Sequence, residues 1–289
     1  MTVVIHTDRE APPGSPALVR DALLRDSNGG VGFLYDFGHR YGWPSGVAPV
    51  DGDVVPDISE TADGAVDIFS GQAVSLIGGG MAFNSVTSKP VEVTIPANFA
   101  ADIWDGGEGD QHFLVCVYLR LLTESDWPAT GTRPVICWTA TSQGYVGPEV
   151  DLLTMGFWTS GGNDYLTSRR QLDGGTDVDT RFFNISGHYG RIGQLAFWRN
   201  GSGARLRWRD SLGVLSDSRA DEGNNTGDFS AKLGHLGVTQ SLWGLSNPDQ
   251  HANTNFRIFR AFGENVAKSG RDPEEVADVD YERNIGRFS

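Results

Sequence analysis

Two carboxylates stand two positions apart in the segment GPEVDLLTMGF, which contains Glu149 and Asp151. Alternate residues of a β-strand lie on the same face, so these two side chains would face the same ligand. Enzymes that cleave glycosidic bonds use a carboxyl pair, one group as an acid and the other as a nucleophile or base. No further carboxylate follows over the next four positions, 152–155, so the proton donor for a leaving group is missing. We therefore interpret the pair as surface acids after a Gly-Pro turn and predict no catalytic residues.

Metal and cofactor chemistry is not indicated by the other polar residues. The six histidines form no HxH or HExxH pair, and no GxSxG element is present. Two acidic, glycine-rich segments, 105–111 (DGGEGDQ) and 173–180 (DGGTDVDT), could supply oxygen ligands to calcium, but neither has the spacing of an EF-hand. We expect solvated loop acids there, no metal site and no cofactor, with calcium as the one ion left open.

Sugar binding requires flat aromatic side chains for stacking, together with amide, carboxylate or hydroxyl groups for hydrogen bonds. The segments FWTSGGNDY and SLWGLSNPDQHANTN combine these residue types. The candidate glycan-binding residues are Trp158, Asn163, Asp164, Tyr165, Trp243, Asn247, Asp249 and His251, with Trp104 and Tyr145 as further options. The alternative is that the tryptophans pack in a core and that the Asn and Asp residues form turns.

The segment GQLAFWRNGSGARLRWRD alternates apolar and polar residues on both sides of a short polar centre, which predicts a β-hairpin. In its second strand, Leu206 and Trp208 would oppose Arg205, Arg207 and Arg209. We expect this hairpin to bury its tryptophans and to leave its arginines in solvent.

Charge and composition exclude several partners. The 289 residues include 23 basic and 37 acidic ones, and the net charge of -14 repels nucleic-acid phosphates and anionic membrane surfaces. No run of 18 apolar residues and no secretory leader pattern is present, so we expect neither membrane insertion nor a signal peptide. Cys116 and Cys137 lie in strand-like runs, where we expect buried free thiols; an inter-strand disulfide is the alternative.

Short strands at regular spacing follow from about residue 56. A series of such strands with few helices between them is typical of an all-β sandwich, most simply a jelly roll. One short helix is expected in IPANFAADIW. The predicted strands are 66–69, 73–77, 81–84, 91–95, 112–122, 133–141, 150–158, 165–170, 181–185, 192–199, 204–210, 213–217, 231–238 and 256–263.

The two ends of the chain differ from this pattern. Residues 1–55 would form an extended arm with a short helix capped by Ser15, lying on the chain's own sandwich or on a neighbouring subunit. Residues 56–270 would form the sandwich. Residues 271–289 would form a helical tail packed on it, with a start at Asp272-Pro273 and an apolar stripe of Val276, Val279 and Ile285.

The segment GHYGRIGQLAFWRNGSGARLRWRDSLG resembles the crossing strands of concanavalin A-like and laminin-G-like jelly rolls. SLIGGGMAFNSVTSKPVEVTIPANF looks like the entry strands of that family, and QHFLVCVYLRL like the long strand after them. Retaining glucanases of this fold carry Glu-x-Asp followed closely by another Glu. Because that last residue is absent after Glu149 and Asp151, the resemblance implies no glucanase activity.

A second resemblance concerns the ends of the chain. FLYDFGHRYGWPSGVAPVDGDVVPDISE and FRIFRAFGENVAKSGRDPEEVADVDYERNIGRF look like segments of structural proteins of tailed bacteriophages and related particles. This resemblance implies a non-enzymatic virion protein, made in the cytoplasm of a bacterial host. Such a fibre or spike would attach to other virion proteins through the N-terminal arm, form a homo-oligomer, often a trimer, and contact host surface glycans. The alternatives are a free carbohydrate-binding module, a glycoside hydrolase or lyase with an unrecognised site, and a scaffold without a ligand.

Overall fold

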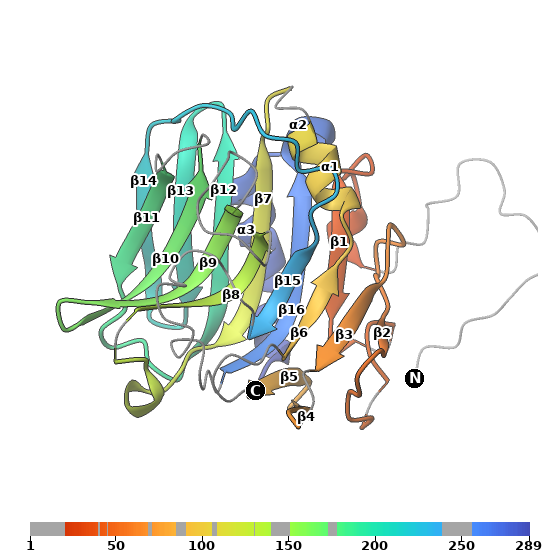
Figure 1. Cartoon of the computed structure of the whole chain (residues 1–289), viewed down its shortest axis with the longest axis vertical. Helices are drawn as coiled ribbons and strands as arrows, with labels where there is room; N and C mark the ends of the chain where they lie inside the picture. Colours follow the sequence, from red (N-terminus) through yellow and green to blue (C-terminus); the bar gives the residue numbers. More distant parts are fainter. Residues whose placement is uncertain are drawn as a thin grey trace, which may run out of the picture.

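Two antiparallel sheets pack face to face in the computed structural model and form a β-sandwich (Figure 1). The structure describes residues 21–39, 41–44, 46–68, 71–84, 91–105, 109–129, 131–139, 151–172, 178–238 and 256–289. Within these residues each sheet has eight strands. The predicted all-β, jelly-roll class with a short C-terminal helix is confirmed.

Sheet A contains the predicted hairpin and the last strand of the chain. Its order is β14 (Gly213–Arg219), β13 (Gly203–Asp210), β12 (Ile192–Asn200), β7 (Phe113–Arg120), β16 (Phe256–Asn265), β5 (Gly80–Asn84) and β4 (Ala73–Ile77), and β1 (Val31–Asp36) also pairs with β16. The pairing of β1 with β16 places part of the expected arm in the sandwich itself.

Sheet B forms the second layer. Its order is β11 (Val178–Asn184), β10 (Asn163–Gln171), β9 (Asp151–Ser160), β8 (Gly131–Thr139), β15 (Gly234–Val238), β6 (Val91–Ile95), β3 (Gly64–Ile68) and β2 (Val54–Val55). The short helices are η1 (Ala22–Leu24), α1 (Asn98–Trp104), η3 (Glu124–Asp126), α2 (Val266–Ser269), α3 (Pro273–Asn284) and η5 (Ile285–Arg287). Every predicted strand is present with somewhat shifted ends, whereas β1 and β2 were not predicted.

The core lies between the sheets because the strands alternate in side-chain direction. In β7, Phe113, Val115, Val117 and Leu119 belong to the inter-sheet core. The intervening residues of β7, including Cys116, belong to a second apolar cluster on the outer side of sheet A. Cys116 and Cys137 are both buried free thiols, as predicted.

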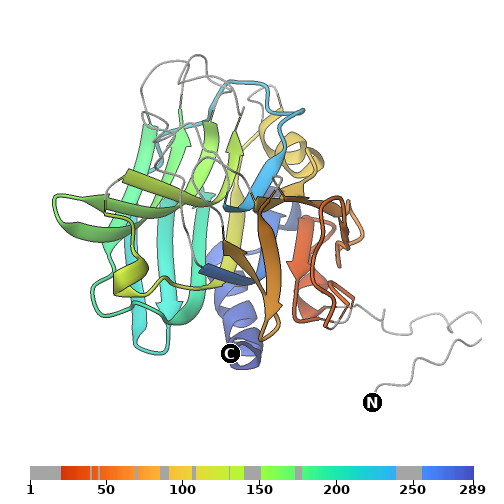
Figure 2. The ribbon, with the colours of Figure 1, turned by 60° about the horizontal axis from the view of Figure 1, so that its bottom comes forward.

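Helix α3 covers part of the outer side of sheet A (Figure 2). The expectation that the hairpin arginines lie in solvent is wrong, because acidic side chains of α3 pair with all three of them. Arg205 bonds Glu274, Arg207 lies 2.8 Å from Asp278, and Arg209 pairs with Asp278 and Glu282. Arg207 is only 2% exposed.

The spacing of these charges explains the docking of α3. Alternate residues of a strand are about 6.6 Å apart, and residues four apart in a helix rise about 6 Å. The arginines are two residues apart in β13, and their acidic partners are four residues apart in α3. The spacing along the strand therefore matches the spacing along the helix over three consecutive ion pairs. The predicted helix start is confirmed by Asp272, whose carboxylate accepts hydrogen bonds from the backbone N–H groups of Glu274 and Glu275. Val279 departs from the predicted apolar stripe, since it is 39% exposed.

A buried charge cluster connects the beginning of the described chain with its end. The Arg260 guanidinium is fully buried and lies 2.8 Å from Asp21, 3.0 Å from Asp36 and 2.8 Å from Asp280. Arg287 also pairs with Asp36. Burial raises the pKa of Asp280 above its usual value, although Arg260 acts in the opposite direction. The cluster ties residues near η1 and β1 to α3 and η5.

Candidate ligand-binding site

The hairpin formed by β9 and β10 projects from sheet B (Figures 1 and 2). Its two turn residues, Gly161 and Gly162, have φ angles of 59° and 76°. Two successive residues with positive φ between paired strand ends are the geometry of a type I′ turn, for which glycine is well suited. This turn sets the register in which Trp158 lies directly opposite Tyr165.

Three aromatic side chains form a cluster on the outer face of sheet B. Phe157 and Leu166 point into the core, so their neighbours Trp158 and Tyr165 point outward. The Trp158 and Tyr165 ring centroids are 5.0 Å apart with an interplanar angle of 33°. We call Trp158, Tyr165 and Phe182 the aromatic platform.

Phe182 extends the platform onto β11. Its ring lies edge-on to Trp158 at 5.2 Å and to Tyr165 at 5.4 Å, and 37% of Phe182 is exposed. The backbone N–H of Phe182 donates to Asp217 of β14 at 3.1 Å, which joins the edges of the two sheets beside the platform. Trp158 and Tyr165 are half-buried, and together with the exposed Phe182 they form an apolar surface suited to stacking against a flat ligand face.

An amide group lies next to these rings. Asn184 is directly opposite Tyr165 in the ladder between β10 and β11, so it lies on the same face, and it is exposed. Its Oδ1 accepts a hydrogen bond from the backbone N–H of Ser186 at 2.8 Å. Among the described residues its Nδ2 has no hydrogen-bond partner, so the amide can donate to a ligand lying on the platform.

Two of the predicted ligand residues in this hairpin form hydrogen bonds within the protein. Asn163 donates to the backbone oxygen of Gly161 at 3.3 Å, within the turn. Asp164 accepts hydrogen bonds from the hydroxyls of Thr159 at 3.1 Å and Tyr189 at 2.7 Å. Burial raises the pKa of the Tyr189 hydroxyl, and its hydrogen bond to Asp164 raises it further. The structure therefore unites Trp158 and Tyr165 in one surface and uses Asn163 and Asp164 to hold the hairpin.

The remaining sequence candidates divide into two groups. Trp104 is fully buried in the core, which excludes it as a ligand contact. Asp151 begins β9. The residues that lie outside the described part of the chain are Trp243, Asn247, Asp249, His251, Tyr145 and Glu149.

Phe182 and Asn184 were missed by the sequence analysis. The segment RFFN contains both, and strand alternation alone would place Phe182 and Asn184 on one face. What the sequence did not reveal was the register of β11 on β10, which brings that face beside Trp158.

Ionisable groups form pairs elsewhere in the sandwich. His188 Nδ1 lies 2.7 Å from Asp210 Oδ2, and His235 Nδ1 lies 2.8 Å from Glu92 Oε1. Burial raises the pKa of Asp67, which faces Glu92 across the β3–β6 ladder.

In the described ranges, no three His, Cys, Asp or Glu side chains come together in a group that could hold a metal ion. Among the helices described, none is long and apolar enough to span a membrane.

No family model and no curated protein matches the sequence. Solved structures with a similar fold include the binding domain of botulinum neurotoxin DC in complex with rat synaptotagmin II. Its sequence is 11% identical, the TM-score is 0.54, and the match covers 88% of this chain and 51% of that one. A structure titled for the dependence of botulinum neurotoxin type C cell entry on two ganglioside molecules is 12% identical, with a TM-score of 0.56 and coverages of 88% and 51%. The binding domain of serotype D is 11% identical, with a TM-score of 0.54 and coverages of 90% and 53%. The chain thus spans about half the length of these structures, and the likeness shows a shared fold.

Proposed function

We propose that this β-sandwich is a non-catalytic binding module that holds a glycan against the aromatic platform. The observation that carries the proposal is the placement of Trp158, Tyr165 and Phe182 in mutual contact on an outer sheet face, with an exposed Asn184 amide beside them. Sugar rings present C–H faces that stack on aromatic rings and hydroxyls that accept hydrogen bonds from amides. Structures with the same fold include binding domains of botulinum neurotoxins, and one structure is titled for the dependence of type C neurotoxin cell entry on two ganglioside molecules, which supports a glycan ligand here.

A glycan array probed with the purified chain tests this proposal, followed by calorimetry with the strongest ligand. Replacing Trp158 with Ala removes the central stacking surface and should weaken binding about tenfold, or about 1.4 kcal/mol. Leu212→Ala is the matched control, because Leu212 is also an exposed apolar residue (57%) but lies in the turn between β13 and β14. An array without any signal would favour a scaffold role, and release of reducing ends from a polysaccharide would favour an enzyme.

The virion setting implied by the ends of the sequence is a further part of the proposal. The β1–β16 pairing and the Arg260 cluster attach residues from Asp21 onward to the sandwich. The attachment to a particle or a sister subunit is proposed for residues 1–20, which lie outside the described part of the chain. Immunogold electron microscopy of purified particles is the test, and absence of the protein from particles would exclude this setting. A free carbohydrate-binding module would instead bind glycans as a monomer.

A further inference from the structure

Most arginines on the outer side of sheet A and around α3 have a carboxylate partner. Pairs of this kind include Arg205–Glu274, Arg207–Asp278 and Arg271–Glu264. This is the expected arrangement in a chain with 37 acidic and 23 basic residues. Arg120 and Arg191 differ, because neither forms a salt bridge within the described residues.

The two unpaired arginines are held in place by neutral groups. Arg120 donates through Nε to the backbone oxygen of Gly190 at 3.1 Å, and Arg191 donates through Nη1 to the Ser211 hydroxyl at 3.1 Å. Each of these bonds uses one N–H group and leaves the others for a ligand, since arginine has five N–H donors in a planar fork.

Arg120 has a second arginine as its neighbour across the sheet, and that neighbour, Arg257, donates to the backbone oxygen of Ser289 at 2.9 Å. Arg120 lies directly opposite Arg257 in the ladder between β7 and β16, and like charges in that relationship destabilise a sheet. Burial and the charge of Arg120 both lower the pKa of Arg257. A bound anion would relieve this repulsion.

Arg120 and Arg191 line the same hollow, with a volume of about 580 Å³, between the ends of β7 and β12 and the C-terminal end of α3. Ile192 and Ile285 supply an apolar part of its lining, and Ser211 supplies a hydroxyl. Tyr281 also lines it, but it is 7% exposed and its ring is covered by the Arg209 guanidinium. No carboxylate side chain is among the described residues that line it. The hollow between η1 and α3, by contrast, is lined by Asp and Glu side chains as well as arginines.

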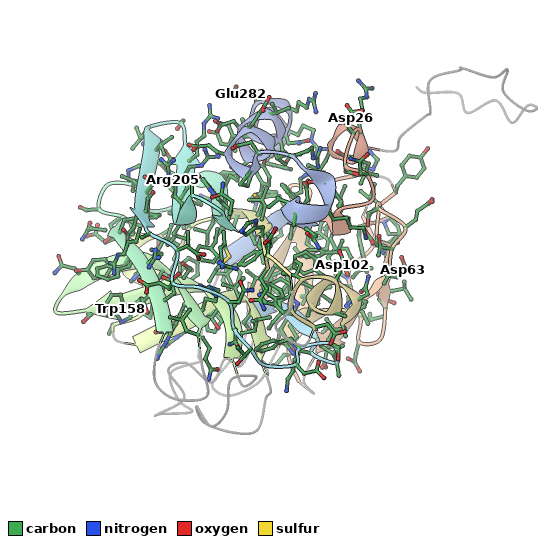
Figure 3. All side chains as sticks on the ribbon, turned by 90° about the horizontal axis from the view of Figure 1, so that it is seen from above. Asp26, Asp63, Asp102, Trp158, Arg205 and Glu282 are labelled. Atoms are coloured by element: carbon green, nitrogen blue, oxygen red, sulfur yellow. The ribbon has the colours of Figure 1, made fainter. Side chains whose placement is uncertain are left out.

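We infer that this hollow is a second binding site, specific for an acidic sugar whose carboxylate or sulfate group is held by Arg120 and Arg191. Guanidinium groups bind both oxyanions with charge-assisted hydrogen bonds. The apolar side chains of Ile192 and Ile285 suit the C–H face of the sugar ring. The site is separate from the aromatic platform, because it lies on the outer side of sheet A whereas the platform lies on the outer face of sheet B. In Figure 3, Glu282 of α3 lies at the top and Trp158 of the platform at the lower left.

The test is an NMR titration of the arginine Nε–Hε resonances with sodium glucuronate, glucose 6-sulfate and glucose at constant ionic strength. We expect saturable shifts with at least one of the two acidic sugars and none with glucose. A response to glucuronate alone identifies a carboxylate site, a response to glucose 6-sulfate alone identifies a sulfate site, and a response to both supports a general oxyanion preference. Absence of a saturable shift with both acidic sugars would overturn the inference.

Charge-matched variants distinguish the loss of this site from the effect of changing the overall charge of the protein. The double variant Arg120→Gln/Arg191→Gln should weaken binding at least tenfold. Arg25→Gln/Arg219→Gln removes the same two charges elsewhere and should leave the affinity within twofold; equal losses in both double variants would contradict the inference. Arg191→Gln alone should weaken binding severalfold, and provides the test if the double variant fails to fold. Trp158→Ala should leave this site unchanged, so failure here is distinguishable from failure of the aromatic platform.

Discussion

Arg207 of β13 and Asp278 of α3 form an ion pair of 2.8 Å in which the arginine side chain is 2% exposed and the carboxylate side chain is 45% exposed. The guanidinium is enclosed by its surroundings: it also donates to Gln194 at 3.2 Å and lies 5.3 Å from the centre of the Trp198 ring. The carboxylate thus supplies the counter-charge for a cation that cannot be hydrated, which makes this pair the centre of the contact between α3 and sheet A.

Removing that counter-charge should destabilise the protein more than removing an acid at the edge of the same row. We expect Asp278→Asn to lower the free energy of unfolding by about 1–3 kcal/mol, because it leaves Arg207 with only the more distant Glu274 carboxylate, at 3.7 Å. Glu282→Gln changes an acid whose side chain is 66% exposed, so it should cost at most about 0.5 kcal/mol. Urea denaturation of the two variants measures the difference, and equal losses would show that the row acts only through net charge.

The Arg260 cluster should be the most sensitive charge site among those described. Arg260→Leu leaves Asp21, Asp36 and Asp280 close together with only Arg287, and should cost about 3–5 kcal/mol at pH 7. The variant should lose less stability at pH 5, because its crowded carboxyl groups bind protons more readily in the folded state. Arg260→Lys keeps the charge but loses the planar fork, so we expect an intermediate cost. Thermal unfolding at both pH values tests this order.

Stability should also depend on pH through Asp221. The hydrogen bond from Arg199 lowers the pKa of this carboxyl below its usual value of 3.8. A lowered folded-state pKa contributes stability that is present above pH 3.8 and is lost as the pH falls through the folded-state value. Wild type should therefore be more stable than Asp221→Asn at pH 7, by at most about 1 kcal/mol because the pair is partly exposed. The difference should shrink below pH 4 in urea unfolding curves; a constant difference would contradict this assignment.

Local sequence patterns predicted much of the fold. The alternation in residues 204–210 placed Leu206 and Trp208 in the core and the arginines on the opposite face, as observed. It could not show what covers those arginines, because Arg205 and Glu274 are 69 residues apart. The segment Val31–Asp36 was missed as a strand because all six residues are buried, so it has no polar–apolar alternation.

Only the part of the candidate site that lies within one local segment was predicted from the sequence. Trp158 and Tyr165 flank a Gly-Gly turn within one hairpin, so a local segment contains both of them and the turn that pairs them. Phe182 and Asn184 come from the next strand, and only the pairing of β10 with β11 brings them alongside. Arg120 and Arg191 are likewise distant in sequence, and their shared hollow depends on the position of α3.

The Gly161–Gly162 turn should control both the stability of the hairpin and ligand binding on the platform. Gly161 has a φ of 59° and no atom within 4 Å of the position that a Cβ would take, so a substitution there meets backbone strain without a steric clash. Asparagine tolerates this conformation, whereas a β-branched residue does not. We expect Gly161→Asn to leave the stability within about 0.5 kcal/mol and Gly161→Val to cost about 1–2 kcal/mol.

If the turn sets the opposition of Trp158 and Tyr165, Gly161→Val should also weaken glycan binding, while Gly161→Asn preserves it. Calorimetric unfolding and glycan titration of both variants measure the two effects, and unchanged binding in Gly161→Val would show that the platform does not depend on this turn.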